Sequence, residues 1–203
     1  MRVSAEAIVR SALRDRLLSE VSGAREGVEE FWVRRSHERA DLAVIGSTLD
    51  AFEIKTERDT LQRLPRQATA YARLFDHCTA VVAEKHLDAA SLLLPDWWGI
   101  TVTSVGKSPR FEKTREARPN PAIDPQTLVR LLWRNDAMAA LTELGHRPDP
   151  GASRGALWNE LLDRASIASL RTTVRLAILN RDPAGARIPT RRFTTALGTA
   201  GAG

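Results

Sequence analysis

Residues 39–56 read RADLAVIGSTLDAFEIKT, and this stretch decides the fold that we expect. Its two halves carry apolar, strand-forming residues, and the turn-forming segment Gly46-Ser47-Thr48 lies between them. This pattern predicts an antiparallel hairpin of two strands, at residues 40–45 and 50–56. An apolar hairpin has no structural need for an acid two residues before a lysine, so its charges require their own explanation.

Three charged side chains of the hairpin can meet on one face. Side chains alternate across a strand, so Glu53 and Lys55 share a face. Directly opposed residues of an antiparallel pair also share a face of the sheet, and we expect Asp41 to lie opposite Lys55. The same register places Ala43 opposite Glu53 and gives a metal site in outline. The alternative is a solvated face with a cross-strand Lys–Asp pair, worth about 0.2–1 kcal/mol.

The hairpin is expected to lie within an α/β fold, a mixed sheet with helices on both faces. Apolar residues recur at helical spacing in some segments, and short β-branched runs mark others. The predicted order is a helix at 4–22, strands at 30–34, 40–45 and 50–56, a helix at 61–75, a strand at 78–83, a helix at 87–94 and a strand at 99–105.

The composition changes along the chain and predicts four parts. Residues 1–108 form the α/β core. Residues 109–125 contain four prolines and alternating charges, which predicts a linker or an ordered surface loop. Residues 126–180 have apolar residues at helical spacing and form a C-terminal helical appendage. Residues 181–203 lack such periodicity and are expected to form a flexible tail.

The overall composition excludes several classes of protein. With 203 residues and 43% hydrophobic content, the chain can bury a normal core, so disorder throughout is excluded. No apolar run approaches the roughly 20 residues of a membrane helix, and charges near the N-terminus exclude a secretion signal. A single cysteine, Cys78, permits no intrachain disulfide. We therefore expect a cytoplasmic protein with no membrane partner.

The charges are unevenly distributed along the chain. Residues 1–103 carry 14 Lys/Arg and 16 Asp/Glu, whereas residues 104–203 carry 16 Lys/Arg and 9 Asp/Glu. A basic region beside an acidic site suits a nucleic-acid enzyme, since phosphates are attracted generally while the acids hold a metal locally. The alternative is the arginine-rich composition that is common in proteins from GC-rich genomes.

The motifs extend beyond the hairpin and resemble those of a known group. Arg39-Ala40-Asp41, Glu53-Ile54-Lys55 and Gln67-x-x-x-Tyr71 look like the PD-(D/E)XK nuclease superfamily, especially its RecB-type branch with a Q-x-x-x-Y helix. The predicted element order also matches the restriction-endonuclease-like fold of that superfamily. Over residues 1–180, further segments resemble a little-characterised bacterial family within it. They are Arg58 to Tyr71, Trp97-Trp98-Gly99-Ile100 and Leu131-Leu132-Trp133-Arg134.

The resemblance implies a role for each matching residue. Asp41 would be the first metal-binding aspartate, Glu53 the second acid and Lys55 the catalytic lysine. A further metal-binding acid is expected near the first strand, where Glu30 is the best match. Its substitutes are Glu29 and Glu20. The chain departs from the superfamily in one respect, because an alanine replaces the proline that usually precedes the aspartate.

The Q-x-x-x-Y helix and several arginines would complete this site. Gln67 and Tyr71 lie four residues apart and hence on one helical face. The resemblance implies that they orient phosphate or the catalytic lysine; otherwise Tyr71 is a core residue and Gln67 a surface one. Four arginines are expected to hold DNA phosphates, with an exposed basic helix face as the alternative. They are Arg39, Arg58, Arg63 and Arg66.

The predicted function is a Mg²⁺- or Mn²⁺-dependent deoxyribonuclease that acts on DNA of unspecified strandedness. Asp41 and Glu53, with Glu30, would hold the metal, and Lys55 would position or activate water. The rival is a non-catalytic nucleic-acid-binding module with a nuclease-like fold. A homo-oligomer, or a partner in DNA repair or phage defence, is compatible with either.

Other candidate residues are expected to be structural. Cys78 precedes an apolar run and should be buried. Trp97 and Trp98 end a short helix and should pack in the core, with base stacking as the alternative. The histidines show no metal-binding spacing. They are His37, His77, His86 and His146.

Overall fold

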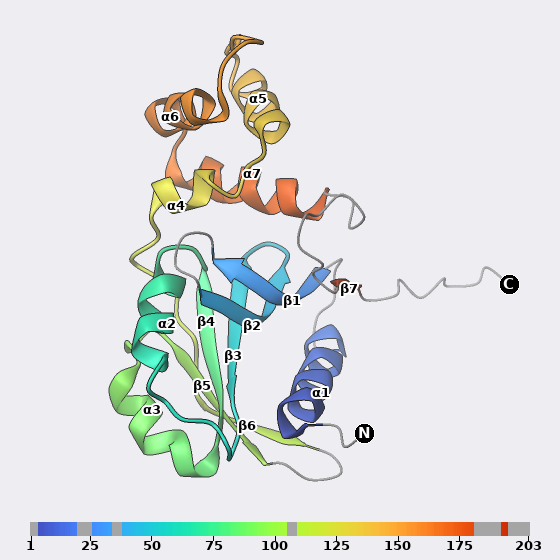
Figure 1. Cartoon of the computed structure of the whole chain (residues 1–203), viewed down its shortest axis with the longest axis vertical. Helices are drawn as coiled ribbons and strands as arrows, with labels where there is room; N and C mark the ends of the chain where they lie inside the picture. The colour runs from blue at the N-terminus through green and yellow to red at the C-terminus, as the bar shows by residue number, and fades with distance from the viewer. Residues whose placement is uncertain (1–3, 20–25, 34–37, 105–108, 181–191, 195–203) are drawn as a thin grey trace, which may run out of the picture.

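The computed structural model describes residues 4–19, 26–33, 38–104, 109–180 and 192–194. These residues form a mixed sheet with helices on both faces and a further group of helices beyond one end (Figure 1), so the predicted α/β architecture is confirmed. The strands are β1 (Glu26–Val33), β2 (Glu38–Ile45), β3 (Leu49–Lys55), β4 (His77–Ala83), β5 (Gly99–Ser104), β6 (Arg110–Arg115) and β7 (Arg192–Thr194). The helices are α1 (Ala5–Ser19), α2 (Leu64–Ala72), the 3-10 helix η1 (Glu84–His86), α3 (Leu87–Leu93), α4 (Pro125–Val129), α5 (Arg134–Glu143), α6 (Arg154–Arg164) and α7 (Ile167–Leu179).

The order of the strands across the sheet is β6-β5-β4-β3-β2-β1-β7. Strands β1, β2 and β3 form an antiparallel meander, whereas β4 and β5 run parallel to β3. Parallel neighbours need crossover connections, and α2 and α3 supply them. The outer strands β6 and β7 are antiparallel to their neighbours. Strand β3, which carries the acid and lysine of the motif, therefore lies in the middle of the sheet.

The register of the β2–β3 hairpin differs from the predicted one by two residues. Ala43 pairs with Ala51 and not with Glu53. The predicted pairing of Asp41 with Lys55 is wrong for the same reason. The first residue of β3 is an apolar, buried leucine that joins the strand and shortens the loop to three residues. A shift of two residues keeps side chains on their faces, so Glu53 and Lys55 still share the face of Ala51.

Two hydrophobic clusters pack against the two faces of the sheet. The larger cluster contains side chains of α2, α3 and the C-terminal helices. The smaller one packs Val9 and Leu13 of α1 against Leu42, Ile54 and Val81. Figure 1 shows α1 across the sheet from α2 and α3, and these two faces are called the α1 side and the α2 side below. None of the described helices is both long enough and apolar enough to cross a membrane.

Helices α4 to α7 are joined to the sheet by polar contacts. The Asp124 side chain caps α4 and accepts a hydrogen bond from Arg73, which follows α2, at 2.5 Å. Asp76, which is 2% exposed, accepts a hydrogen bond from the Leu49 N–H at 2.7 Å and forms an ion pair with Arg171 of α7. Because this carboxylate is buried, it needs both partners.

Two segments differ from the predicted organisation. Residues 110–115, inside the predicted linker, form β6 and pair with β5. Residues 192–194, inside the predicted tail, form β7 and pair with β1. The rest of the range 181–203 lies outside the described residues. Both strands add to open edges of the sheet, and such pairing depends on a partner that is distant in sequence.

Candidate active site

The Glu53 carboxylate is the centre of a buried polar network. Its Oε1 accepts hydrogen bonds from Lys55 Nζ and Gln67 Nε2, both at 2.6 Å. Its Oε2 accepts one from the Tyr71 hydroxyl at 2.6 Å. Strand alternation places the lysine beside the acid, and the four-residue spacing on α2 places the amide and the phenol above them. The structure thus brings together four of the predicted catalytic residues, three of them 2% exposed or less and the fourth, Lys55, 8% exposed.

The Tyr71 hydroxyl has two acceptors and one hydrogen to give. Besides Glu53, the main-chain oxygen of Arg39 lies 2.7 Å from the hydroxyl. Burial and the neighbouring Glu53 charge raise the pKa of Tyr71, so the phenol stays protonated. Its ring is held by an edge contact with Phe75 at 5.4 Å and by stacking on Trp98 at 5.8 Å. The hydroxyl can therefore donate its hydrogen to only one of these two oxygens at a time.

Asp41 meets this network at the place where β2 and β3 separate. The last described pair of the ladder is Leu42 with Phe52, and beyond it the Ile54 N–H donates to Asp41 Oδ2 at 2.7 Å. Burial, followed by the nearby charge of Glu53, raises the pKa of Asp41 to about 7. Two carboxylates thus lie close enough for their charges to interact, with Lys55 on Glu53 and Arg10 near Asp41.

The alternation of β1 and β2 breaks beside Asp41. Val28 and Phe31 both lie in the larger cluster, although residues three apart on a regular strand face opposite sides. Between them, Glu30 adopts a left-handed backbone with a φ of 58°. Glu30 and Asp41 both approach Arg10 of α1, at 3.6 and 3.9 Å. Asp41 therefore approaches both Arg10 on the α1 side and Glu53 of the network.

Glu30 is paired with cations and is not joined to the other two acids. Its carboxylate contacts Arg39 at 3.1 Å as well as Arg10. Arg10 also forms an ion pair with Glu6, one helical turn earlier. Sequence reasoning missed Arg10 and Glu6, and the signal for them was their i, i+4 spacing on the first helix. Of the substitutes for Glu30, Glu29 pairs with Arg14 at 3.4 Å, and the glutamate at 20 lies outside the described residues.

The acids of the site suit a hard divalent cation with few protein ligands. In the part of the chain that the structure describes, no three His, Cys, Asp or Glu side chains are grouped to hold a metal. Mg²⁺, however, is commonly bound by one or two carboxylates together with water and substrate phosphate. Asp41 and Glu53 supply oxygen donors only, and burial, followed by the charge of Glu53, raises the pKa of Asp41. The residues therefore fit Mg²⁺ or Mn²⁺.

The arginines predicted to hold phosphates lie in two groups. Arg63 and Arg66 are 61% and 69% exposed, and both pair with Glu38, at 3.1 and 2.5 Å. The hydrogen bond that Arg63 donates to Glu38 raises the pKa of Arg63, and the charge of Glu53 adds to this effect. Arg39 lies on β2 and pairs with Glu30. Arg58 is exposed in the loop after β3. Glu38 fixes two of these guanidinium groups near the network, which the sequence did not reveal.

The residues expected to be structural lie away from the network or inside the core. Cys78 and Trp98 are fully buried, as predicted. His77 pairs with Asp50, and His86 contacts the Thr56 carbonyl oxygen. His37 lies outside the described residues.

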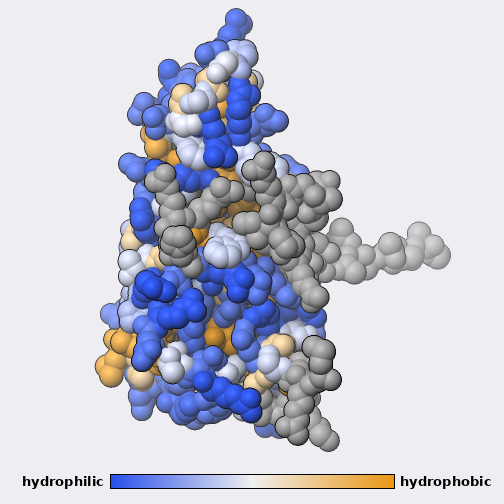
Figure 2. Space-filling view, in the orientation of Figure 1, coloured by the Kyte–Doolittle hydropathy of each residue, from blue (hydrophilic) through white to orange (hydrophobic). Residues whose placement is uncertain are grey.

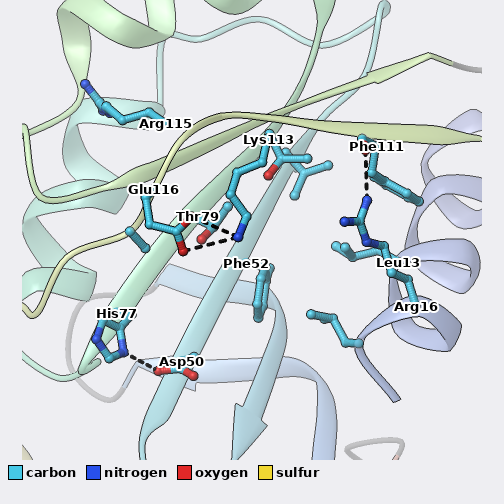
Figure 3. Close-up of a pocket in the computed structure, with 14 residues that line it drawn as sticks. Leu13, Arg16, Asp50, Phe52, His77, Thr79, Phe111, Lys113, Arg115 and Glu116 are labelled. Carbon is cyan, nitrogen blue, oxygen red and sulfur yellow. Dashed lines mark hydrogen bonds and ion pairs between the residues drawn. The ribbon is translucent and has the colours of Figure 1, made fainter. Parts of the chain in front are cut away.

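A cavity of about 370 Å³ lies on the α1 side between α1 and β6, and none of the predicted site residues lines it (Figure 3). Phe52 forms part of its floor. Four of its polar groups lie in pairs, Lys113 with Glu116 and His77 with Asp50, each at 2.8 Å, whereas Arg16 and Arg115 donate to main-chain oxygens. The predicted site residues meet at the Glu53 network and not at this cavity, so we place the candidate chemistry at the network.

Comparison with known proteins gives two findings. Residues 1–186 match the family described as Bacteriophage P4 protein cII. The chain is also similar to Protein cII of Enterobacteria phage P4, with 28% identity over 166 residues, which are 81% of this chain and 61% of that relative. The chain thus matches less than two thirds of the length of the relative. No solved structure matches the chain.

Proposed function

The chain belongs to the Bacteriophage P4 protein cII family, and for it we propose the function of a divalent-metal-dependent deoxyribonuclease with a restriction-endonuclease-like core. One observation carries the proposal, the convergence of Lys55, Gln67 and Tyr71 on Glu53 next to Asp41. The carboxylate of Asp41, which is partly buried beside Glu53, has its pKa raised by burial and by the charge of Glu53. Perturbed acids of this kind cluster at functional sites.

Each residue of the network has a role in phosphodiester hydrolysis. Water attacks the phosphorus, the bond to the leaving sugar oxygen breaks, and one proton moves from the water to the leaving oxygen or to solvent. The Lys55 ammonium would orient the attacking water and stabilise negative charge on the phosphate. Gln67 and Tyr71 hold the Glu53 carboxylate from the α2 side, so its position does not change during the reaction.

Asp41 and Glu53 are the residues that would hold Mg²⁺ or Mn²⁺. When bound, the cation would offset the charge that develops on the phosphate oxygens. The arginines contribute separately, because bidentate hydrogen bonds from exposed guanidinium groups suit the flanking phosphates. Arg63 just before α2, Arg66 on α2 and Arg39 on β2 are exposed and could hold DNA beside the network.

The test is cleavage of plasmid, linear and single-stranded DNA in Mg²⁺, in Mn²⁺ and in EDTA. We expect metal-dependent cleavage by the wild type and a loss of at least about a hundredfold for Lys55→Ala. Lys113→Ala is the matched control, because Lys113 also pairs with a glutamate but lies on β6, outside the network. Equal cleavage by wild type and Lys55→Ala would remove the proposed role of the lysine.

A second candidate is a non-catalytic nucleic-acid-binding module. It is favoured by one observation, that the described residues contain no three-acid metal group. A binding module would show salt-dependent affinity for DNA without turnover in any divalent metal. Cleavage that Asp41→Asn abolishes, while DNA binding is retained, would exclude this alternative.

A further inference from the structure

The Glu53 network opens to solvent on the side of Asp41. Glu53 and Gln67 are each 2% exposed, and Tyr71 is fully buried. Where β2 and β3 separate, the Asp41 side chain is 20% exposed and the Arg39 side chain is 43% exposed. If the proposed function is correct, a substrate can meet Asp41 directly only from this open side.

Trp32 of β1 lies at this opening. It pairs with Arg39 across the β1–β2 ladder, and the Arg39 guanidinium lies 5.5 Å from the centre of its ring. The neighbours Phe31 and Val33 face the larger cluster, so alternation turns Trp32 to the α1 side. Trp32 belongs to neither hydrophobic cluster of the described residues, and it is 39% exposed.

Arg39 links this ring to the network. Its main-chain oxygen lies 2.7 Å from the Tyr71 hydroxyl, which in turn donates to Glu53. Its guanidinium contacts both the Trp32 ring and Glu30. The exposed Trp32 ring, with the Arg39 guanidinium over it, is thus connected to the proposed catalytic network through Arg39.

Other exposed apolar side chains lack such a setting. The face in Figure 2 is mainly hydrophilic, with hydrophobic areas that are small and separate. One of these areas lies over α3, which carries the exposed Leu92 and Leu93. Leu92 is 89% exposed, and α3 packs on the α2 side, across the sheet from the opening beside Asp41.

We propose that Trp32 and Arg39 form a stacking platform for an unpaired DNA base, so that the substrate is single-stranded at the position next to the cleaved bond. Aromatic rings and guanidinium groups are the side chains on which unpaired bases stack. A base inside a duplex is already stacked on both faces, so the ring cannot reach it without unpairing. Arg39 would also contact the phosphate beside that base. The inference rests on the proposed function for the position of the cleaved bond.

The test measures binding in EDTA, where cleavage does not interfere. The probes are a short single strand that contains 2-aminopurine and a hairpin duplex of the same sequence. The variants are Trp32→Leu and Trp32→Phe, with Leu92→Ala as an exposed apolar control on α3. Circular dichroism and thermal melting establish that each variant is folded.

We expect Trp32→Leu to bind the single strand about 5- to 150-fold more weakly, with little change for the duplex. Trp32→Phe should retain most of the affinity and the quenching of 2-aminopurine, and Leu92→Ala should behave as the wild type. Unchanged single-strand binding by Trp32→Leu would overturn the platform, as would equal weakening for both probes. Metal-dependent cleavage that still requires Lys55 would then leave the proposed function standing. A wild type that binds neither probe would overturn the platform, whereas the proposed function is tested separately by cleavage in Mg²⁺ and Mn²⁺.

Discussion

Replacement of Asp41 by asparagine should stabilise the metal-free protein at neutral pH and not at acidic pH. The Asp41 carboxylate is mostly buried, lies close to Glu53 and has a pKa of about 7. Asparagine has the same shape and keeps an oxygen to accept the hydrogen bond of the Ile54 N–H. The substitution therefore removes a charge and retains the main contact of the side chain.

The magnitude follows from the difference between the two pKa values of the carboxyl. In the unfolded chain Asp41 has a pKa near 3.8, and in the folded protein one of about 7. Between these values the folded state binds more protons, so stability falls as the pH rises and is constant above about 7. Each pH unit corresponds to about 1.4 kcal/mol, which gives a ceiling of about 4 kcal/mol at pH 8. Coupling to Glu53 divides this effect between the two acids.

Urea unfolding in EDTA at several pH values between 5 and 8 measures this effect. We expect the stability of Asp41→Asn relative to the wild type to increase with pH up to about 7 and then to level off. Asp124→Asn is the control, because the hydrogen bonds from Thr127 and Arg73 outweigh burial and lower the pKa of Asp124. Asp124 thus contributes its stability above a pKa of about 3.8, and its variant should show a constant difference over this range. A constant difference for Asp41→Asn as well would refute the raised pKa of Asp41 in the folded protein.

Three further predictions concern other parts of the molecule. Glu53→Gln should abolish the binding of Mn²⁺ measured by calorimetry. The wild type should bind Mn²⁺ and release a proton near pH 6.5, because metal binding deprotonates its ligands. Binding without proton release would contradict the assignment of Asp41 as a ligand. Asp76→Ala should lower the free energy of unfolding by roughly 3 kcal/mol, since it removes the buried partner of the Leu49 N–H and of Arg171. Denaturant unfolding measures this loss, which would be smaller if water replaces the carboxylate. Leu157→Ala, at a fully buried position of α6, should cost about 2–5 kcal/mol in the same measurement, and a negligible change would indicate that the helical group does not pack as one core.

The elements of the sheet could be predicted because their signals are local. Alternation in β3 sets Glu53 beside Lys55, and four-residue spacing in α2 sets Gln67 above Tyr71, whatever the rest of the chain does. The position of β6 could not be predicted, because a strand with mainly exposed, charged side chains carries no apolar pattern. It forms by pairing with β5, whose open edge is a property of the assembled sheet.

Local patterns specify the mixed α/β fold and the residues that surround Glu53, because periodicity fixes which side chains share a face of one element. How the elements meet depends on packing between segments that are distant in the chain. The left-handed backbone of Glu30 turns that acid towards Arg10 and Arg39, and Asp41 also approaches Arg10. These contacts join residues that are 9 to 31 positions apart in the chain, and no local pattern specifies them. Which acids remain available for a metal is therefore set by packing.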